Sequence, residues 1–136
     1  MEKKYICVTC GTQYPQSEAE PPECPICEDE RQYVGWSGQR WTTLEEMKAR
    51  GKFKNEWKEV EPGLWSVVTR PEFAVGERAF LLRTPRGNLL WDCIAFINED
   101  TIKVVKKLGG LKFIAISHPH YYTSMNEWSQ AFGAPV

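Results

Sequence analysis

The chain has 136 residues, of which 42% are hydrophobic and 26% are charged. This balance supplies enough apolar material for a packed core and excludes the composition of a disordered chain. Lys and Arg number 17, Asp and Glu number 18, and the formal net charge is −1. A nearly neutral chain gives no electrostatic reason to expect nucleic acid or an anionic membrane as a partner.

The sequence also gives an expectation about the compartment. No stretch approaches the roughly 20 apolar residues that a membrane-spanning helix needs. The opening residues, Met1–Cys7, lack the apolar segment of a secretory signal. We therefore expect a cytoplasmic protein. Thiols stay reduced in the cytosol, so clustered cysteines indicate metal or redox chemistry rather than disulfides.

Residues 1–36 form a distinct block that holds four of the five cysteines. A segment shorter than about 40 residues buries too little apolar surface to fold without a metal, a disulfide or a partner. Two Cys-x2-Cys pairs, separated by 13 residues, can place four thiolates around one tetrahedral cation. The spacing predicts a structural metal site with zinc as the expected ion and four ligands: Cys7, Cys10, Cys24 and Cys27.

Two other interpretations of these cysteines are a pair of disulfides and a redox dithiol. The block resembles the rubredoxin-like and zinc-ribbon modules, with Cys-Val-Thr-Cys-Gly and Cys-Pro-Ile-Cys as its two turns. The short gap between the pairs is most similar to the rubredoxin-like tail of rubrerythrins. Four thiolates also suit iron. Since the sequence has no partner domain for electron transfer, we expect a structural role and keep an iron electron carrier as an alternative.

Residues 37–59 are expected to form a linker with one short helix. Thr42 or Thr43 can cap this helix, acidic residues follow in its first turn, and Gly51 ends it.

Residues 60–136 have the pattern of a sheet followed by alternating elements. The turn sequence Thr84–Gly87 predicts a hairpin between two apolar runs. A later strand–helix–strand order implies a parallel pair of strands with a covering helix. The predicted elements are strands at Leu64–Thr69, Arg78–Arg83 and Asn88–Asp92, a helix at Glu99–Leu108, a strand at Leu111–Ser117 and a helix at Thr123–Phe132.

The two histidines of the chain, His118 and His120, follow the strand that ends at Ser117. In an extended segment, residues two apart lie on one face, so both imidazoles can share a cation. Loops at the carboxyl ends of strands are also where α/β sheets place their sites. Two histidines in a loop are often ordinary surface residues, so the metal and the surface interpretations both stay open.

Here the chain resembles the metallo-β-lactamase fold family over residues 60–136. Arg78–Leu82 and Asn88–Asp92 look like the opening hairpin of that family, and Ile114–His120 looks like the strand that leads into its H-x-H-x-D-H metal motif. The resemblance implies an α+β or α/β fold, the first half of an αββα sandwich following the small metal ribbon. It also implies that His118 and His120 bind a first zinc ion. Asp92 would not bind the ion itself but would orient the two histidines.

The sequence departs from this family at two places. Tyr122 and Thr123 stand where the family has its aspartate and final histidine. A tyrosine, with a pKa near 10, is a poor substitute for a carboxylate at neutral pH. The chain also ends after the first half of such a fold, and two histidines fall short of the roughly three protein ligands of a catalytic zinc. We therefore expect a hydrolase-like protein that is truncated or catalytically impaired, and whether it is an enzyme stays open.

The alternative functions are a non-catalytic, metal-stabilised interaction module and the iron electron carrier. Expected partners are a small-molecule substrate if the protein is active, and a second copy or a missing C-terminal half, because half a sandwich leaves one sheet face bare. The fifth cysteine, Cys93, lies in an apolar run and is expected to be a buried, inert thiol rather than a nucleophile.

Overall fold

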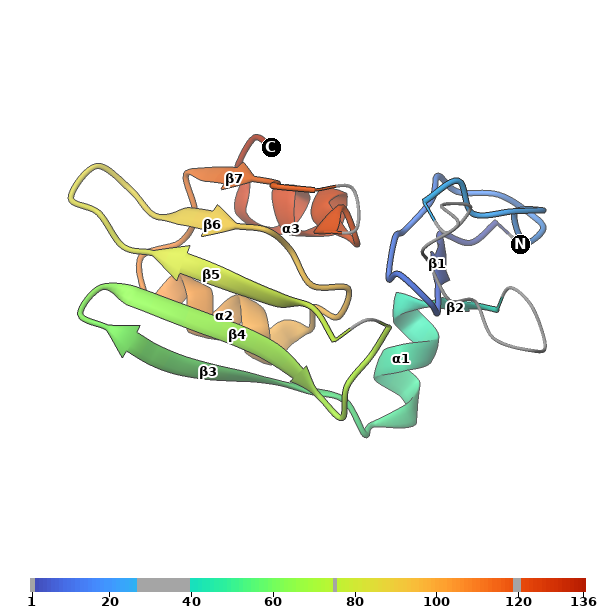
Figure 1. Ribbon diagram of the computed structural model, residues 1–136, viewed down its shortest axis with the longest axis horizontal. Coiled ribbons are helices and arrows are strands. Elements are labelled where there is room, and N and C mark those ends of the chain that lie inside the picture. The colour runs from blue at the N-terminus through green and yellow to red at the C-terminus, as the bar shows by residue number, and fades with distance from the viewer. Residues whose placement is uncertain (1, 27–39, 75, 119–120) are drawn as a thin grey trace.

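The computed structural model describes residues 2–26, 40–74, 76–118 and 121–136. These residues form a small two-stranded sheet, a five-stranded sheet and three short helices (Figure 1). Residues 2–26 and the small sheet lie at one end of the molecule, and the larger sheet with two of the helices forms the rest.

The small sheet pairs β1 (Tyr5–Cys7) with β2 (Trp41–Thr43) in antiparallel fashion. Helix α1 (Leu44–Arg50) follows β2 directly. The Thr43 side chain accepts a hydrogen bond from the Glu46 N–H at 3.1 Å, which satisfies one of the unpaired donors at the start of the helix. Gly51 ends the helix in the left-handed conformation, with φ at 65°. The predicted short helix and both of its ends are confirmed.

The larger sheet has the strand order β3-β4-β5-β6-β7. All neighbours are antiparallel except β6 and β7, which are parallel and are joined through helix α2. The predicted hairpin and the predicted strand–helix–strand unit are therefore confirmed. The bounds are β3 Lys54–Glu61, β4 Leu64–Arg70, β5 Arg78–Leu82, β6 Leu89–Trp91, α2 Glu99–Lys107 and β7 Phe113–Ala115.

Strand β3 lies mostly within the residues expected to form a linker. Its side chains alternate at first between exposed and half-buried, with Asn55 and Trp57 on the half-buried side. Thr69 Oγ1 donates to Asn55 Oδ1 at 2.6 Å, and the Asn55 amide donates to the Phe96 carbonyl at 2.8 Å. The strand lies at an edge of the sheet, and most of its residues are charged. Charged side chains at an edge oppose pairing with another chain. Because these charged residues replace the alternating apolar pattern of a typical strand, the sequence did not predict a strand here.

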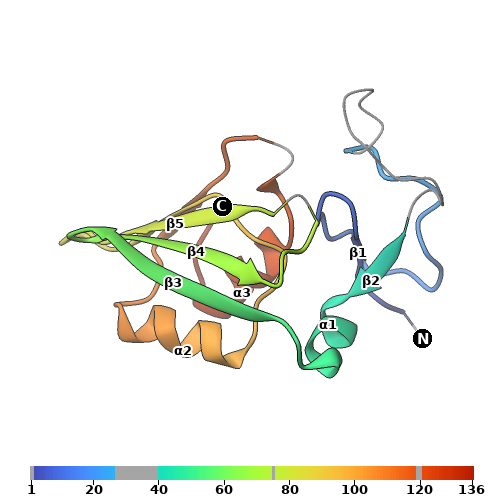
Figure 2. The same cartoon turned by 60° about the horizontal axis from the view of Figure 1, so that its bottom comes forward.

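Helices α2 and α3 (Met125–Phe132) cover one face of the five-stranded sheet (Figures 1 and 2). The Asn98 side chain caps α2 by accepting from the Thr101 N–H at 3.0 Å. Trp128 of α3 is fully buried, and its Nε1 donates to the Ile94 carbonyl at 3.0 Å. The core under the helices contains the inward-facing residues of successive strands: Val67, Ala79, Leu81, Leu90 and Ile114.

The expectation of the first half of an αββα sandwich is wrong. A sandwich needs a second sheet stacked about 10 Å from the first, with both inner faces apolar. In the described residues the other two strands form the small sheet beside α1 instead, and the five-stranded sheet is packed only by helices on one face (Figure 2). Turn signals and the order of elements predicted the hairpin and the parallel pair, but the resemblance to that family wrongly predicted how the layers stack.

Among the described residues, every helix is too short or too polar to cross a lipid bilayer.

Candidate metal centre

Three of the predicted thiol ligands come together. The Sγ atoms of Cys7, Cys10 and Cys24 all lie within 4.8 Å of one another, and all three residues are buried. Cys10 Sγ and Cys24 Sγ are 3.7 Å apart. Four sulfurs at 2.3 Å from a tetrahedral metal ion would be about 3.8 Å apart, so the donor set fits a thiolate-bound cation. Cys27, the predicted fourth ligand, lies outside the described residues and stays a prediction.

The distance between the sulfur atoms also shows that Cys10 and Cys24 are not joined by a disulfide. A sulfur–sulfur bond is about 2.05 Å long, far shorter than the 3.7 Å between Cys10 and Cys24. The disulfide interpretation of this pair is therefore not supported, and a cluster of three thiols is more than a redox dithiol requires.

A tight backbone turn presents the first two thiols. The Gly11 N–H donates to the Cys7 carbonyl at 2.7 Å, and the Cys7 N–H donates to the Thr12 carbonyl at 2.9 Å. Gly11 has a φ of 80°, a conformation that suits glycine. A Cβ at this position would also overlap Glu77 Oε1, so the turn needs glycine for two independent reasons.

Hydroxyl groups surround the sulfurs. Tyr14 Oη lies 2.9 Å from Cys24 Sγ, and Thr12 Oγ1 lies 3.2 Å from Cys10 Sγ. Hydrogen bonds to Cys24 and Cys7, followed by burial, raise the pKa of the Cys10 thiol. A bound cation would oppose this rise, because it favours the thiolate.

The cysteine turn is anchored to the rest of the molecule. The Gln13 N–H donates to the Thr123 carbonyl at 2.8 Å. Lys4 Nζ lies 3.4 Å from Glu127 Oε1 at the start of α3. Thr123, at the position of the final histidine in the resembled family motif, is buried with a φ of 40°. Its backbone thus serves to hold the N-terminal block.

The second predicted site lies at the carboxyl ends of β6 and β7. Asp92 follows β6 with a φ of 65°, and its N–H donates to the Ala115 carbonyl at 2.7 Å. Asp92 Oδ1 accepts from the Ser117 backbone N–H at 2.8 Å and from Ser117 Oγ at 2.9 Å. A left-handed non-glycine residue costs about 1 kcal/mol or more, which these charge-assisted hydrogen bonds offset. Asp92 therefore fixes the residue that precedes His118.

The histidine pair is only partly described. His118 is exposed, and its carbonyl accepts from the Tyr121 N–H at 2.9 Å. His120 lies outside the described residues. The only group of three or more suitable ligands in the described part of the chain is the cysteine cluster, so a metal ion at His118 and His120 stays a prediction. Tyr122 is 37% exposed.

Cys93 and Glu77 are buried groups outside both predicted sites. Cys93 is fully buried, and burial, together with the charge of Asp92, raises the pKa of its thiol, as expected for an inert thiol. Glu77 was not predicted as functional. It is 6% exposed, and its Oε1 has no hydrogen-bond partner among the described residues. Burial raises the pKa of Glu77 to about 8, although the backbone N–H groups of Glu77 and Gly76 oppose the rise.

Tyr14 was also missed, and neither it nor Glu77 stands in a recognisable spacing. Each gains its role from contacts between segments that are distant in the sequence.

No known protein family matches the chain. The chain is 48% identical over 132 residues to a protein of Bacillus subtilis (strain 168) named "Uncharacterized protein YmaE". The alignment covers 97% of this chain and 48% of that protein. The chain thus spans about half the length of the curated relative that it matches. The relative's name states no activity.

Proposed function

We propose that the chain is a metallo-hydrolase-like protein with two metal positions, a structural one at its cysteines and a catalytic one at its histidines. The proposal is carried by the contact between Asp92 and Ser117, which holds the segment entering His118 at the carboxyl ends of two adjacent parallel strands. Polar groups at this edge of a sheet are where α/β proteins place their chemistry.

At the cysteines, the proposed ion is zinc, with Cys27 completing the set of Cys7, Cys10 and Cys24. Four protein ligands leave no open coordination position, and such a closed site stabilises structure rather than reacting. The apolar cluster around these thiols is small, with Tyr14, Ile26 and Trp41 as its partly buried members. A bound ion would therefore contribute much of the stability of this block.

At the histidines, a zinc ion would supply Lewis acidity toward a substrate oxygen or an activated water. His118 and His120 would hold it, and Asp92 would keep the loop in place. Two histidines are one ligand short of a typical catalytic zinc site. A further ligand could come from polypeptide corresponding to the other half of the relative, so the chain alone is expected to be catalytically impaired.

A non-catalytic, metal-stabilised module is the second candidate. Tyr122 and Thr123 favour it, because neither replaces the carboxylate and histidine of the resembled motif, and the Thr123 carbonyl bonds the N-terminal block instead. An iron electron carrier is the third candidate, since four thiolates also suit iron.

Metal analysis of the protein purified under reducing conditions tests these candidates. We expect one tightly bound zinc ion per chain, which is lost in Cys24→Ser together with a large fall in the melting temperature. After zinc is added, a second ion should bind in the wild type and in Asn126→Ala, an exposed control, but not in His118→Ala. Failure to bind a second ion would remove the hydrolase proposal in favour of the structural module. A red protein with a reversible redox signal would support the electron carrier.

A further inference from the structure

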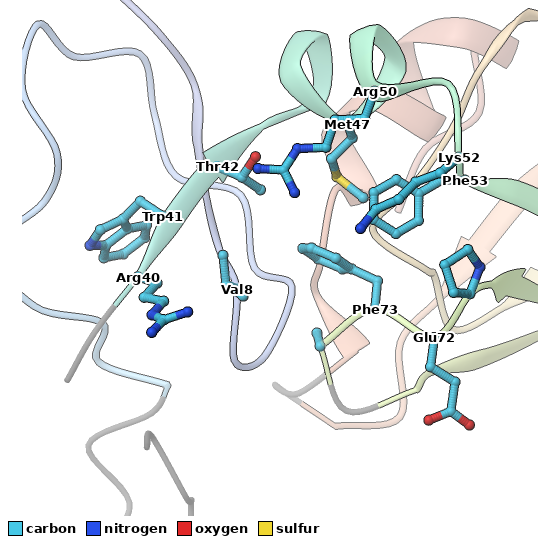
Figure 3. A pocket seen from close by; sticks show the side chains of 12 residues that line it. Val8, Arg40, Trp41, Thr42, Met47, Arg50, Lys52, Phe53, Glu72 and Phe73 are labelled. Carbon is cyan, nitrogen blue, oxygen red and sulfur yellow. The ribbon is translucent and has the colours of Figure 1, made fainter. Parts of the chain in front are cut away.

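A cavity of about 490 Å³ lies between the N-terminal unit and the five-stranded sheet (Figure 3). Val8 and Trp41 line it from the cysteine turn and β2, and Phe53 and Phe73 line it from the segments that flank β3 and β4. Its volume falls within the range of about 300–1,000 Å³ that is typical of small-molecule sites, which often lie between structural units. The described metal ligands Cys7, Cys10, Cys24 and His118 are not among the residues that line it.

Three cationic side chains border this cavity. Arg50 is the last residue of α1, and Lys52 follows it after the left-handed turn at Gly51. The third, Arg40, precedes β2, and its carbonyl accepts a hydrogen bond from the Val8 N–H at 3.0 Å. In Figure 3 the Arg50 side chain extends from α1 across the cavity toward Thr42.

The cavity is therefore locally basic in a chain whose formal net charge is −1. Glu72 is the single carboxylate among the described lining residues. In Figure 3 its carboxylate points away from the three cations, and a Cβ added at Gly76 would lie 3.4 Å from Glu72 Oε2. Glu72 thus does not offset the positive charges of Arg50 and Lys52 within the cavity.

Aromatic rings form the apolar part of the wall. Phe53 and Phe73 make an edge-to-face contact with ring centroids 5.8 Å apart. Trp41 is held edge-on against Tyr14 at 5.6 Å, which ties its orientation to the cysteine block. Lys52 Nζ lies 5.2 Å from the centroid of the Phe53 ring, so a cation and an aromatic surface stand side by side. These contacts fix the orientation of the rings and place aromatic surface next to positive charge.

We propose that this cavity binds an anionic ligand with a planar ring, of which a nucleoside monophosphate is the simplest form. The guanidinium of Arg50 offers paired donors that match phosphate oxygens, and Lys52 adds a point charge beside it. A planar base can stack on the exposed part of Phe73. An anion without a ring would make no contact with the aromatic wall, and an uncharged ring would make no ion pair with Arg50 or Lys52.

Titration calorimetry on the metal-loaded full chain, with adenosine monophosphate as the probe, tests the proposal. Inorganic phosphate and adenosine serve as the two half-ligands. We expect the monophosphate to bind at least about tenfold more tightly than either half-ligand, since it uses both parts of the cavity. We also expect its affinity to fall as the ionic strength rises. No measurable binding at low ionic strength, or equal affinity for the monophosphate and for phosphate, would overturn the proposal.

Variants locate the binding. In Arg50→Gln/Lys52→Gln the affinity for the monophosphate should fall about tenfold or more. Lys48→Gln is the matched control, because Lys48 is exposed on the same helix and does not line the cavity. Phe73→Leu should weaken the monophosphate but leave phosphate unchanged. Unchanged affinity in the double variant would contradict the assignment. Arg50 and Lys52 are both exposed, so the double variant is expected to fold. The comparison of the three ligands on the wild type tests the proposal without any variant.

Discussion

At the scale of single residues, the contact between Gly11 and Glu77 joins the cysteine turn to the larger sheet. Glu77 is buried at this junction with one carboxylate oxygen that no described residue satisfies. Burial without a cationic partner favours the neutral acid. Gly11 has no side chain, and that absence makes room for the carboxyl group.

The raised pKa of Glu77 makes a prediction about pH. Its folded-state pKa is about 8, above the value of about 4.3 expected in the unfolded chain. Between these values the unfolded state releases its proton and the folded state keeps it, so the free energy of unfolding falls as pH rises. Below about pH 4 this group has no effect, and above about pH 8 its cost is constant.

Glu77→Gln removes this ionisation while keeping the shape of the side chain. We expect the variant to gain up to a few kcal/mol over the wild type at pH 8, because each pKa unit corresponds to about 1.4 kcal/mol. The gain should shrink toward zero at acidic pH. Urea unfolding of both proteins across this range measures it. A difference that does not change with pH would show that Glu77 does not titrate as inferred.

At the scale of secondary-structure elements, many features follow from local signals. Caps and glycines mark α1 and α2, a turn sequence marks the hairpin, and a strand–helix–strand order marks the parallel pair. These signals act within a few residues, so the sequence displays them directly. No such local signal predicts strand β3, because it lies at an edge of the sheet and carries mostly charged residues.

The parallel pair of β6 and β7 depends on a long-range contact at its carboxyl end. Asp92→Ala should destabilise the protein by about 2–3 kcal/mol, because it removes the acceptor of the Ser117 N–H and leaves an alanine in the left-handed conformation. Asp92→Asn should cost less, since asparagine tolerates this conformation and keeps one acceptor oxygen. Denaturant unfolding compares the two variants. Equal stability of Asp92→Ala and the wild type would show that this contact contributes nothing.

At the scale of the whole molecule, the face of the five-stranded sheet opposite the helices carries several exposed apolar side chains. Leu82, Trp91 and Phe113 are 41%, 47% and 53% exposed, and the strand register places all three on this face. The edges of the sheet are protected, since β3 is charged and the Ile114 N–H at β7 donates to the Pro135 carbonyl at 2.9 Å. Association is therefore expected through the face rather than through an edge.

A second copy of the chain is the expected occupant of this face, because a nearly neutral protein has little charge repulsion to oppose self-association. Light scattering should show a dimer or larger species whose population rises with concentration. Trp91→Lys should shift the population toward the monomer. Tyr122→Lys is the control, since Tyr122 is an exposed aromatic residue in the loop before α3. A wild type that stays monomeric at all concentrations would contradict this expectation.

The sequence by itself determined that the cysteines gather, since spacing alone predicted a cluster of which the structure brings together Cys7, Cys10 and Cys24. It also determined most helices and strands, because caps, turns and periodicity are local. Only the tertiary structure decided the layer arrangement, the burial of Glu77 against Gly11 and the basic cavity beside the cysteine block. The physical reason is that these features depend on contacts between segments far apart in the chain, and no local pattern records such contacts.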